Sequence, residues 1–594
     1  MTKIELIAFY EKRRQNFEGL LTRKKQQINL VSNVRLLIAA VTLIIIYFGF
    51  KDPVILYAGI PFLIGFIWLV RWHSDLFVEK VHLTNLVAVN VSEAEALQGD
   101  FSSFSQGSEF IDPHHPYTHD LDIFGEGSLY QSINRCNTRD GKKSLSHLLS
   151  THLPSAEEIR LHQQAIKELA SKADFRQNLQ ASGMEIDEQP RDRPELLSWI
   201  KVPDFIYGNP VIRIILWLLP LLTILSLIGW IMLDVPKGLF FLFVLAQWIT
   251  LGIYSKRINA FHEYISRKKN ILEKYGHILN VFQPETFAST RGSKLRAEAQ
   301  NADVKVKKLA SLVTALNARL NFMTSMFVNS ILLYDMQCVY RLEKWKRENA
   351  SSLQLWMDAI CEAEVLSSLG TFAFNNPGFV YAVIHDELAI ETQGVGHPLL
   401  SVDECVTNDI ALGKEPSILV ITGANMAGKS TFLRTMGVNL VLALAGAPVC
   451  AKSYRCPVVA IRSGMRTADS LKDHESYFYA ELHRLKSIMD ELRNGKPLFI
   501  LLDEILKGTN SGDKQRGSIA LVRQLVIQSC LALVATHDLA LGDLEKEYPG
   551  RIRNFCFEAN IENDQLSFDY RLKPGLAQKM NATFLMKKMG IIPD

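Results

Sequence analysis

Four uncharged, apolar stretches stand out from the otherwise mixed pattern of hydrophobic and polar positions along this 594-residue chain. They form two pairs, residues 36–50 with 53–70 and residues 214–233 with 238–254, each pair separated by a short polar turn. A transmembrane helix needs about 20 apolar residues. We therefore predict two transmembrane helical hairpins, with Arg35, Arg71 and Lys256 reaching toward the lipid headgroups at the shorter spans. The alternative is that these stretches are core helices of a soluble protein.

Basic residues near the spans predict the topology. Residues 1–35 carry eight Lys/Arg against three Asp/Glu, and Arg71, Lys256 and Arg257 follow the second and fourth spans. The positive-inside rule then places both termini and residues 71–213 in the cytoplasm, in a multi-pass protein of the cell (inner) membrane. The pattern of residues 1–35 also predicts an amphipathic helix. Such a helix can lie on the inner leaflet, pack on the protein, or be solvated.

The rest of the pattern divides into helical and mixed regions. Local signals predict a helix over residues 128–134, a helix cap near residues 138–140 and a helix continuing through Leu149, whereas the C-terminal region alternates strands and helices as in a parallel α/β sheet. The predicted domains are a basic amphipathic helix (1–35), a first transmembrane hairpin (36–72), a helix and linker (73–119), the first part of a helical core (120–210), a second transmembrane hairpin (211–255), further core helices (256–370) and a C-terminal α/β domain (371–594).

Charge and cysteine content narrow the possible functions. The net charge is only +3, so any nucleic-acid surface must be local. Residues 256–308 carry twelve Lys/Arg against five Asp/Glu and can contact nucleic-acid phosphates; a solvated helix face and contact with anionic lipids remain alternatives. Eight cysteines without a C-x-x-C pair indicate reduced thiols rather than a disulfide framework or zinc ribbon.

Residues 417–439 carry the strongest chemical signal. An apolar strand leads into a loop that fits G-x-x-x-x-G-K-[ST], and a helix follows. Gly423 and Gly428 allow backbone N–H groups to point at phosphate oxygens, Lys429 brings a cation to the β- and γ-phosphates, and Ser430 offers a hydroxyl to Mg²⁺. The predicted nucleotide-binding residues are Gly423, Ala424, Asn425, Met426, Ala427, Gly428, Lys429, Ser430 and Thr431.

Two further apolar strands end in polar residues. Residues 498–502 run into Asp503 and Glu504, which suit binding of Mg²⁺ and polarisation of the attacking water respectively. Residues 531–535 end in Thr536-His537, where the histidine can sense the γ-phosphate or orient the water. We predict Glu504, His537 and Lys429 as catalytic residues, and Ser430 and Asp503 as Mg²⁺ ligands. The order of these motifs is typical of P-loop ATPases of the ABC type.

The motifs resemble those of the MutS family. The sequence TGANMAGKSTFLR is similar to the family's phosphate loop, with Ala424 and Ala427 replacing Pro and Gly, and LLDEILKGTNSGD and ATHD are similar to its later motifs. Residues 469–481 resemble the family's signature segment. This resemblance implies that Ser476 reaches the nucleotide of the partner subunit, so that a homodimer forms composite ATP sites. Residues 120–149 resemble the start of the MutS core, and residues 256–369 correspond to its lever helices.

Three departures from the family pattern bear on which parts of the family's function are expected of this chain. Asp473-His474 replaces the signature Ser-Gly, residues 405–407 lack an aromatic for adenine, and the first hairpin leaves no room for a mismatch-reading domain. The resemblance implies a membrane-anchored MutS-family ATPase that uses ATP and Mg²⁺ and binds mismatched or unusual DNA in a repair-related role; repair-protein partners are not identified. The alternative is an ABC-like mechanochemical ATPase that acts on membrane or protein partners without binding DNA.

Overall fold

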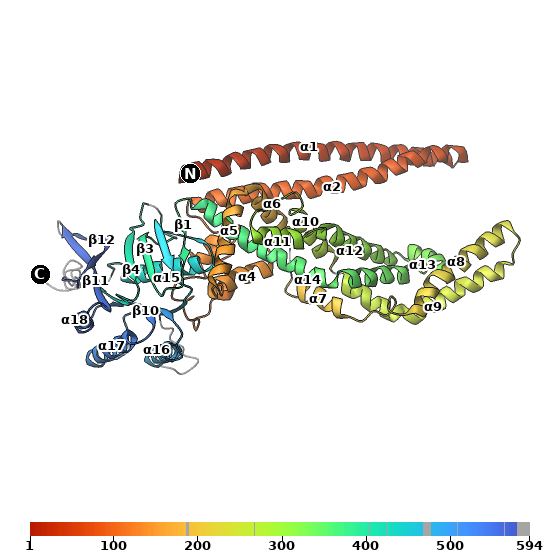
Figure 1. Ribbon diagram of the computed structural model, residues 1–594. Helices are drawn as coiled ribbons and strands as arrows, with labels where there is room; N and C mark the ends of the chain where they lie inside the picture. Colours follow the sequence, from red (N-terminus) through yellow and green to blue (C-terminus); the bar gives the residue numbers. More distant parts are fainter. Residues whose placement is uncertain are drawn as a thin grey trace.

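The computed structural model describes residues 1–50, 52–185, 189–266, 268–401, 403–424, 426–466, 477–507, 509–562 and 565–578. The molecule is elongated: an α/β domain forms one end, a helical body follows, and two helical hairpins extend toward the other end (Figure 1). The expected order of an all-helical region before an α/β region is confirmed, and the tips of both hairpins lie far from the α/β domain.

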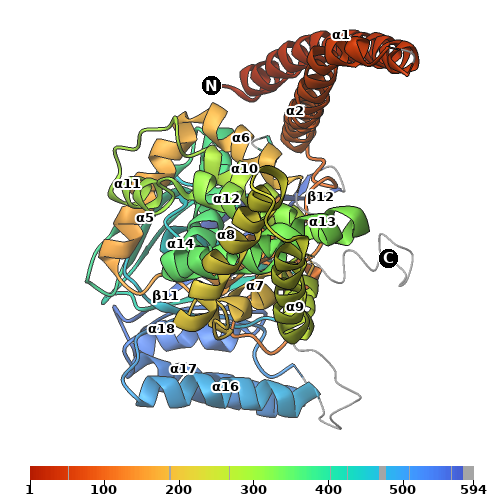
Figure 2. The ribbon, with the colours of Figure 1, turned by 90° about the vertical axis from the view of Figure 1, so that its right-hand side faces the viewer.

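Two long antiparallel helices form the first hairpin, α1 (Lys3–Gly49) and α2 (Pro53–Leu97). Thr2 and Glu5 form a capping box at the start of α1, and Asp52 caps α2 through the backbone N–H of Val54. The basic N-terminal segment and the first apolar stretch are therefore one continuous helix, not two elements. Viewed along the long axis, this hairpin leans away from the remaining helices (Figure 2).

Four of the described helices are long and apolar enough to cross a membrane. They are α1, α2 from Tyr57 onward, α8 (Pro210–Met232) and α9 (Lys237–Ser266). Each covers most of one of the four predicted stretches, and at most 28% of the residues in any of their apolar windows are buried. Exposed apolar surface of this extent is unusual in a soluble protein, which weakens the alternative of soluble core helices.

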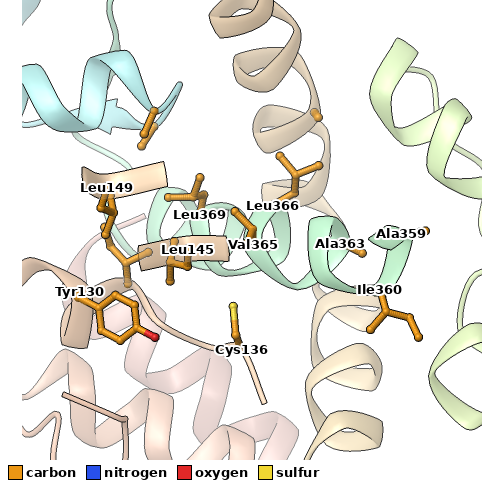
Figure 3. Close-up of a cluster of buried hydrophobic side chains, with 14 of the residues drawn as sticks. Tyr130, Cys136, Leu145, Leu149, Ala359, Ile360, Ala363, Val365, Leu366 and Leu369 are labelled. Atoms are coloured by element: carbon orange, nitrogen blue, oxygen red, sulfur yellow. The ribbon is translucent and has the colours of Figure 1, made fainter. Parts of the chain in front are cut away.

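The helical body surrounds α14 (Tyr334–Asn375), a helix of 42 residues. Its other helices are α3 (Leu129–Ile133), α4 (Arg139–Ser150), α5 (Ala156–Ser171), α6 (Ala173–Gly183), α7 (Asp192–Lys201), α10 (Lys269–Asn280), α11 (Thr290–Glu298) and α12 (Ala302–Asn317). Figure 3 shows residues of α14 such as Val365 and Leu369 in one buried cluster with Tyr130 and Leu145 from α3 and α4. The predicted helix at residues 128–134 and the cap near residues 138–140 are confirmed, because Thr138 caps α4.

The predicted helices of residues 256–370 include an interruption between α12 and α14. A short helix, α13 (Phe322–Leu332), separates α12 from α14, and Leu333 adopts a left-handed backbone conformation with φ +49° at the break. Side chains from both sides of the break meet, because Arg319 Nε lies 3.0 Å from Asp335 Oδ2. A long-range contact thus stabilises an excursion of the chain that helical periodicity alone does not reveal.

A six-stranded sheet organises the α/β domain, in the order β12-β11-β5-β10-β9-β8. Its strands are β5 (Ile418–Gly423), β8 (Ala460–Gly464), β9 (Leu498–Asp503), β10 (Cys530–Thr536), β11 (Ile552–Glu562) and β12 (Gln565–Pro574). All neighbours are parallel except β12, which pairs antiparallel with β11. The expectation of a parallel sheet is therefore confirmed apart from this edge strand.

Helices cover both faces of the six-stranded sheet, because the central strands carry buried side chains on both faces. The central strands β5, β9 and β10 are buried along their whole length. The helices of this domain are α15 (Lys429–Leu444), α16 (Tyr477–Arg493), α17 (Ser511–Val526) and α18 (Leu544–Glu547). The shorter strands form two smaller sheets: β1 (Val380–Tyr381) with β6 (Pro448–Val449), and β2 (Val383–Ile384), β3 (Ile390–Val395), β4 (Asn408–Leu412) and β7 (Ser453–Cys456) together.

The helical body and the α/β domain are joined at Asp120. This carboxylate is fully buried and accepts hydrogen bonds from Ser463 Oγ at 2.7 Å and from the backbone N–H of Met465 at 3.1 Å. It also lies 3.0 Å from Arg484 Nη2 on α16. Because a buried carboxylate is stable only when it is paired and hydrogen-bonded, these contacts hold the two regions in a defined arrangement.

Candidate functional site

Three neighbouring parallel strands deliver the candidate site residues to one edge of the sheet. Thr422 of β5 is in register with Thr536 of β10, and Ala535 of β10 is in register with Asp503 of β9. The carboxyl ends of these strands therefore lie side by side. In open α/β sheets, this edge is where ligands bind.

The loop between β5 and α15 is shaped by its two glycines. A Cβ on Gly423 would lie 2.7 Å from the carbonyl oxygen of Phe557, so only glycine allows strand β11 to pass this closely. Gly428 has a φ of +102°, in the left-handed region, immediately before the first residue of α15. Between the glycines, Met426 is exposed with a φ of +66°, whereas Ala424 and Ala427 are buried. Asn425 lies outside the described residues.

The Lys429 ammonium points back into this loop. Its Nζ donates to the carbonyl oxygens of Gly423 at 2.9 Å and Ala424 at 3.0 Å, and lies 3.3 Å from His537 Nε2. Burial lowers the pKa of Lys429, whereas the nearby carboxylates of Asp503 and Glu504 act in the opposite direction. A buried cation held only by neutral loop carbonyls is well suited to exchange them for an anionic oxygen.

Ser430 and Asp503 provide adjacent oxygen ligands. Ser430 Oγ donates to Asp503 Oδ2 at 2.5 Å. The other carboxylate oxygen, Asp503 Oδ1, is buried and has no hydrogen-bond partner among the described residues. Hard cations such as Mg²⁺ prefer carboxylate and hydroxyl oxygens, and an unpaired buried carboxylate oxygen is costly without such a partner. The two side chains therefore fit Mg²⁺.

Glu504 and His537 form a close pair beside these ligands. His537 Nε2 lies 2.7 Å from Glu504 Oε1. The hydrogen bond from His537 and the nearby charge of Lys507 together lower the pKa of Glu504 to about 2, against the opposing effect of burial. The backbone of Glu504 is in the left-handed region with φ +52°, which is uncommon for a non-glycine residue and typical of functional sites.

Thr431 lies apart from the side chains that converge in this site. It is exposed on the first turn of α15. Residues 467–476, which include Ser476 and the Asp473-His474 pair, lie outside the described residues. Glu481, on α16, accepts from the backbone N–H of Leu506 at 2.6 Å and thus supports the segment that follows Glu504. Burial raises the pKa of Glu481.

The structure adds an aromatic residue that sequence reasoning missed. Tyr570 of β12 lies against the loop, because a Cβ on Gly428 would approach its ring to 3.0 Å. Its ring stacks with Phe568 at 6.0 Å between ring centroids, and the residue is 45% exposed. Asn408 fixes this strand by donating to Tyr570 O at 3.2 Å and accepting from Leu572 N at 2.8 Å. The signal in the sequence was weak, since an aromatic in an edge strand near the C-terminus has many possible roles.

The basic excess of residues 256–308 is partly neutralised in the fold. Lys268 is buried between Asp192 at 2.5 Å and Glu195 at 2.7 Å, and Arg291 pairs with Glu158 and Glu362. Weaker pairs within single helices at 3.7–3.8 Å are Lys269–Glu273, Lys294–Glu298 and Lys307–Asp303. Acidic partners outside the basic stretch thus neutralise Lys268 and Arg291, which reduces the charge available to a phosphate backbone.

Comparison with known proteins relates the α/β domain to a single family. Residues 419–593 match the sequence model of the family described as MutS domain V. The chain is 30% identical over 244 residues to the DNA mismatch repair protein MutS of Thermotoga petrophila, an alignment that covers 40% of this chain and 30% of that protein. It is 33% identical over 223 residues to the DNA mismatch repair protein MutS of Aquifex pyrophilus, covering 37% of this chain and 26% of that protein. The chain therefore spans less than a third of the length of these relatives.

Proposed function

Because its C-terminal domain makes this chain a member of the MutS family, we propose that it is a Mg²⁺-dependent P-loop ATPase with a role related to DNA mismatch repair. The observation that carries this proposal is the convergence of Lys429, the Ser430–Asp503 pair and the Glu504–His537 pair at the ends of three adjacent strands. These groups supply a phosphate-binding cation, cation ligands and a water-orienting carboxylate, which together are the parts that phosphoryl transfer to water needs.

Each side chain has a distinct role in this proposal. Lys429 exchanges its two loop carbonyls for β- and γ-phosphate oxygens of ATP, while the N-terminus of α15 adds partial positive charge. Glu504 holds the attacking water by accepting a hydrogen bond from it. With a pKa of about 2, Glu504 remains ionised at neutral pH and is a weak proton acceptor, so it orients the water more than it removes a proton. His537 holds Glu504 in place and lies near the γ-phosphate.

Asp503 and Ser430 would hold Mg²⁺. When bound, this ion neutralises charge on the phosphates and polarises the bond that breaks. Before it binds, Ser430 Oγ donates to Asp503 Oδ2. We infer that the unpaired Oδ1 of Asp503 and the hydroxyl of Ser430 would be the oxygens that hold the ion.

Tyr570 is our candidate for contact with the adenine base. It is a partly exposed aromatic residue next to Gly428, and its ring stacks with that of Phe568. Aromatic side chains bind planar bases by stacking at little entropic cost. This contact would compensate for the absence of an aromatic residue among residues 405–407.

We further propose a homodimer with composite ATP sites and a membrane anchor of four spans. The family resemblance implies that Ser476 of one subunit contacts the nucleotide bound by the other. The four apolar helices support the anchor, with both termini and the ATPase domain in the cytoplasm of the inner membrane. The hairpin tips and the ATPase domain lie at opposite ends of the molecule, which is compatible with this topology (Figure 1).

DNA is the proposed partner. A second candidate function, without DNA binding, is favoured by ion pairs that neutralise two residues of the basic helices. Binding of mismatched or otherwise unusual DNA follows from the family. Because Lys268 and Arg291 are already paired with carboxylates, an ABC-like mechanochemical ATPase that acts on membrane or protein partners is the alternative. The two functions differ in whether a polyanion binds.

A salt series with the full chain in lipid nanodiscs separates these functions. Binding to homoduplex, mismatched and branched DNA is measured at rising salt concentrations, together with ATP hydrolysis. A DNA-binding protein should lose affinity steeply with salt, because each neutralised phosphate releases counterions. Hydrolysis without DNA affinity at low salt would leave the second function, and absence of hydrolysis with Mg²⁺ and ATP would contradict both.

A further inference from the structure

The short helix α13 has its apolar and polar sides reversed relative to a helix of a water-soluble domain. From Leu320 to Tyr334 the chain contains no Asp, Glu, Lys or Arg. The side chains that face outward are Leu320, Met323, Met326, Phe327 and Leu332; Phe327 is 59% exposed. By contrast, Asn329 on the same helix is only 1% exposed. A helix that buries its amide and exposes its phenyl ring is suited to an apolar surrounding rather than to water.

The inward polar groups of α13 are satisfied by protein partners. Asn329 Oδ1 accepts from the backbone N–H of Asp335 at 3.0 Å, and Asn329 Nδ2 donates to Ser325 Oγ at 3.1 Å. The backbone break at Leu333 is itself buried. In a bilayer, non-helical backbone is tolerated only where protein covers it and where its polar groups have partners. The turn between α13 and α14 meets this condition.

The contacts of α13 place its C-terminal end beside the transmembrane part of α9. Trp248 Nε1 donates to Ser330 Oγ at 3.0 Å, and Gln247 Nε2 donates to the carbonyl oxygen of Ile331 at 3.2 Å. Gln247 also donates to Thr223 Oγ1 of α8 at 2.5 Å. Both donors lie within the apolar part of α9, and Gln247 satisfies a C-terminal carbonyl of α13 that would otherwise face hydrocarbon.

Charged residues stand at both ends of α13 and turn toward the helical body. Arg319 lies 3.0 Å from Asp335 and donates to Asn259 Oδ1 of α9 at 2.7 Å. Figure 2, which looks along the long axis of the molecule, shows α13 projecting sideways from the body beside α9. With 11 residues, α13 is about 16 Å long and is too short to cross a hydrocarbon core of about 30 Å.

We propose that α13 is a fifth membrane element, which lies in the cytoplasmic leaflet and contacts lipid acyl chains through Met323, Met326 and Phe327. The inference rests on the proposed membrane anchoring by α8 and α9, since it extends the same apolar surface to a helix too short to be recognised as a span. Because α13 joins α12 to α14, and α14 runs to the ATPase domain, the helix links the membrane directly to the longest helix of the body.

Lipid-dependent fluorescence quenching tests this placement. The full chain carrying Phe327→Cys is labelled with the environment-sensitive dye NBD and reconstituted in nanodiscs whose phosphatidylcholine bears a doxyl quencher on its acyl chains. We expect loss of NBD emission comparable to that of Leu225→Cys, an exposed position on α8. Val304→Cys, an exposed apolar position near the start of α12, should keep its emission. Labelling of the chain without an introduced cysteine measures the background, which is limited because six native thiols are buried.

Each outcome of the test is decisive. Quenching at Leu225 without quenching at Phe327 would overturn the proposal for α13 and leave the anchor intact. Absence of quenching at both positions would contradict the membrane anchor itself. A third outcome is that NBD emission at position 327 is not quenched by the lipid but changes with the number of chains per disc. This result would show that a second copy of the chain covers α13, and it would also overturn the proposed lipid contact. Met323→Cys, one turn earlier on the helix, serves as an independent second position.

Discussion

At the scale of single residues, the candidate site depends on which charges are paired before the substrate arrives. Glu504 is held by His537 and Lys507, whereas Asp503 keeps one carboxylate oxygen without a partner. The two adjacent carboxylates therefore differ in their surroundings, which suits them to different tasks. Glu504 is fixed for orienting water, and Asp503 remains available to a cation.

Replacing Glu504 by Gln tests the first of these roles. The amide keeps the size of the side chain but cannot accept a hydrogen bond as strongly, so we expect ATP hydrolysis to fall by about 10²-fold or more while ATP binding is retained. Steady-state hydrolysis and equilibrium binding of a fluorescent ATP analogue measure the two effects. Glu545→Gln, an acidic residue on α18, is the matched control; hydrolysis by Glu504→Gln at the parent rate would exclude Glu504 from catalysis.

The pKa of Glu504 predicts how hydrolysis depends on pH. Because this pKa is lowered from 4.5 to about 2, Glu504 stays ionised from pH 5 to pH 9 and contributes no acid limb to the rate profile. The stabilisation of the fold by this ionised group is complete above the unfolded pKa and is lost as pH falls through about 2. In His537→Leu, whose side chain cannot donate a hydrogen bond, the pKa of Glu504 should rise toward 4.5, so that a loss of rate appears near pH 4–5. An unchanged profile in that variant would show that His537 does not hold Glu504.

At the scale of elements, one buried ion pair attaches the first hairpin to the helical body. Arg135 Nε lies 2.5 Å from Glu93 Oε1 on α2, and Asn375 Nδ2 of α14 donates to Glu93 Oε2 at 2.9 Å. The Arg135 guanidinium also stacks over the ring of Phe104 at 3.6 Å. Glu93 and Arg135 are both almost fully buried, so each charge depends on the other for its compensation.

Breaking this pair should loosen the hairpin. Removing one buried partner leaves an uncompensated charge, so Glu93→Ala is expected to destabilise the fold by about 3–5 kcal/mol, and the double variant with Arg135→Ala by less than the sum of the single changes. Denaturant unfolding in detergent measures these free energies. Arg523→Ala, which breaks an exposed pair with Glu547, should cost far less, because solvent screens the charges of an exposed pair. Equal costs for the buried and exposed pairs would contradict the assigned role.

At the scale of the whole molecule, both hairpins extend to the end opposite the α/β domain (Figure 1). A polarised shape of this kind separates a surface suited to lipid from a site suited to a water-soluble nucleotide. The long helix α14 runs between the two ends and packs against α4 and α5 near the α/β domain. In the proposed function, α14 is the element that connects the region of the candidate site to the end of the molecule that carries the apolar hairpins.

Vesicles of known orientation test this arrangement. The chain should remain in the membrane fraction after an alkaline carbonate wash, because four apolar helices hold it in the bilayer. Added protease should degrade the ATPase domain in inverted inner-membrane vesicles and leave it intact in right-side-out vesicles. Extraction by carbonate would contradict the anchor, and cleavage only in right-side-out vesicles would place the domain on the opposite side.

The sequence by itself determined the apolar helices, the glycine loop and the strand ends that carry Asp503, Glu504 and His537, because these features depend on local periodicity and on residues near one another in the chain. Tertiary structure alone decided that Tyr570 meets Gly428, that Glu93 pairs with Arg135 and that α13 lies against Gln247. These partners are separated by tens to more than a hundred residues, and their pairing depends on strand order and helix packing. It also decided that Lys268 and Arg291, within the basic excess at residues 256–308, are neutralised, since charge counted along a helix does not include the carboxylates that other helices bring to it.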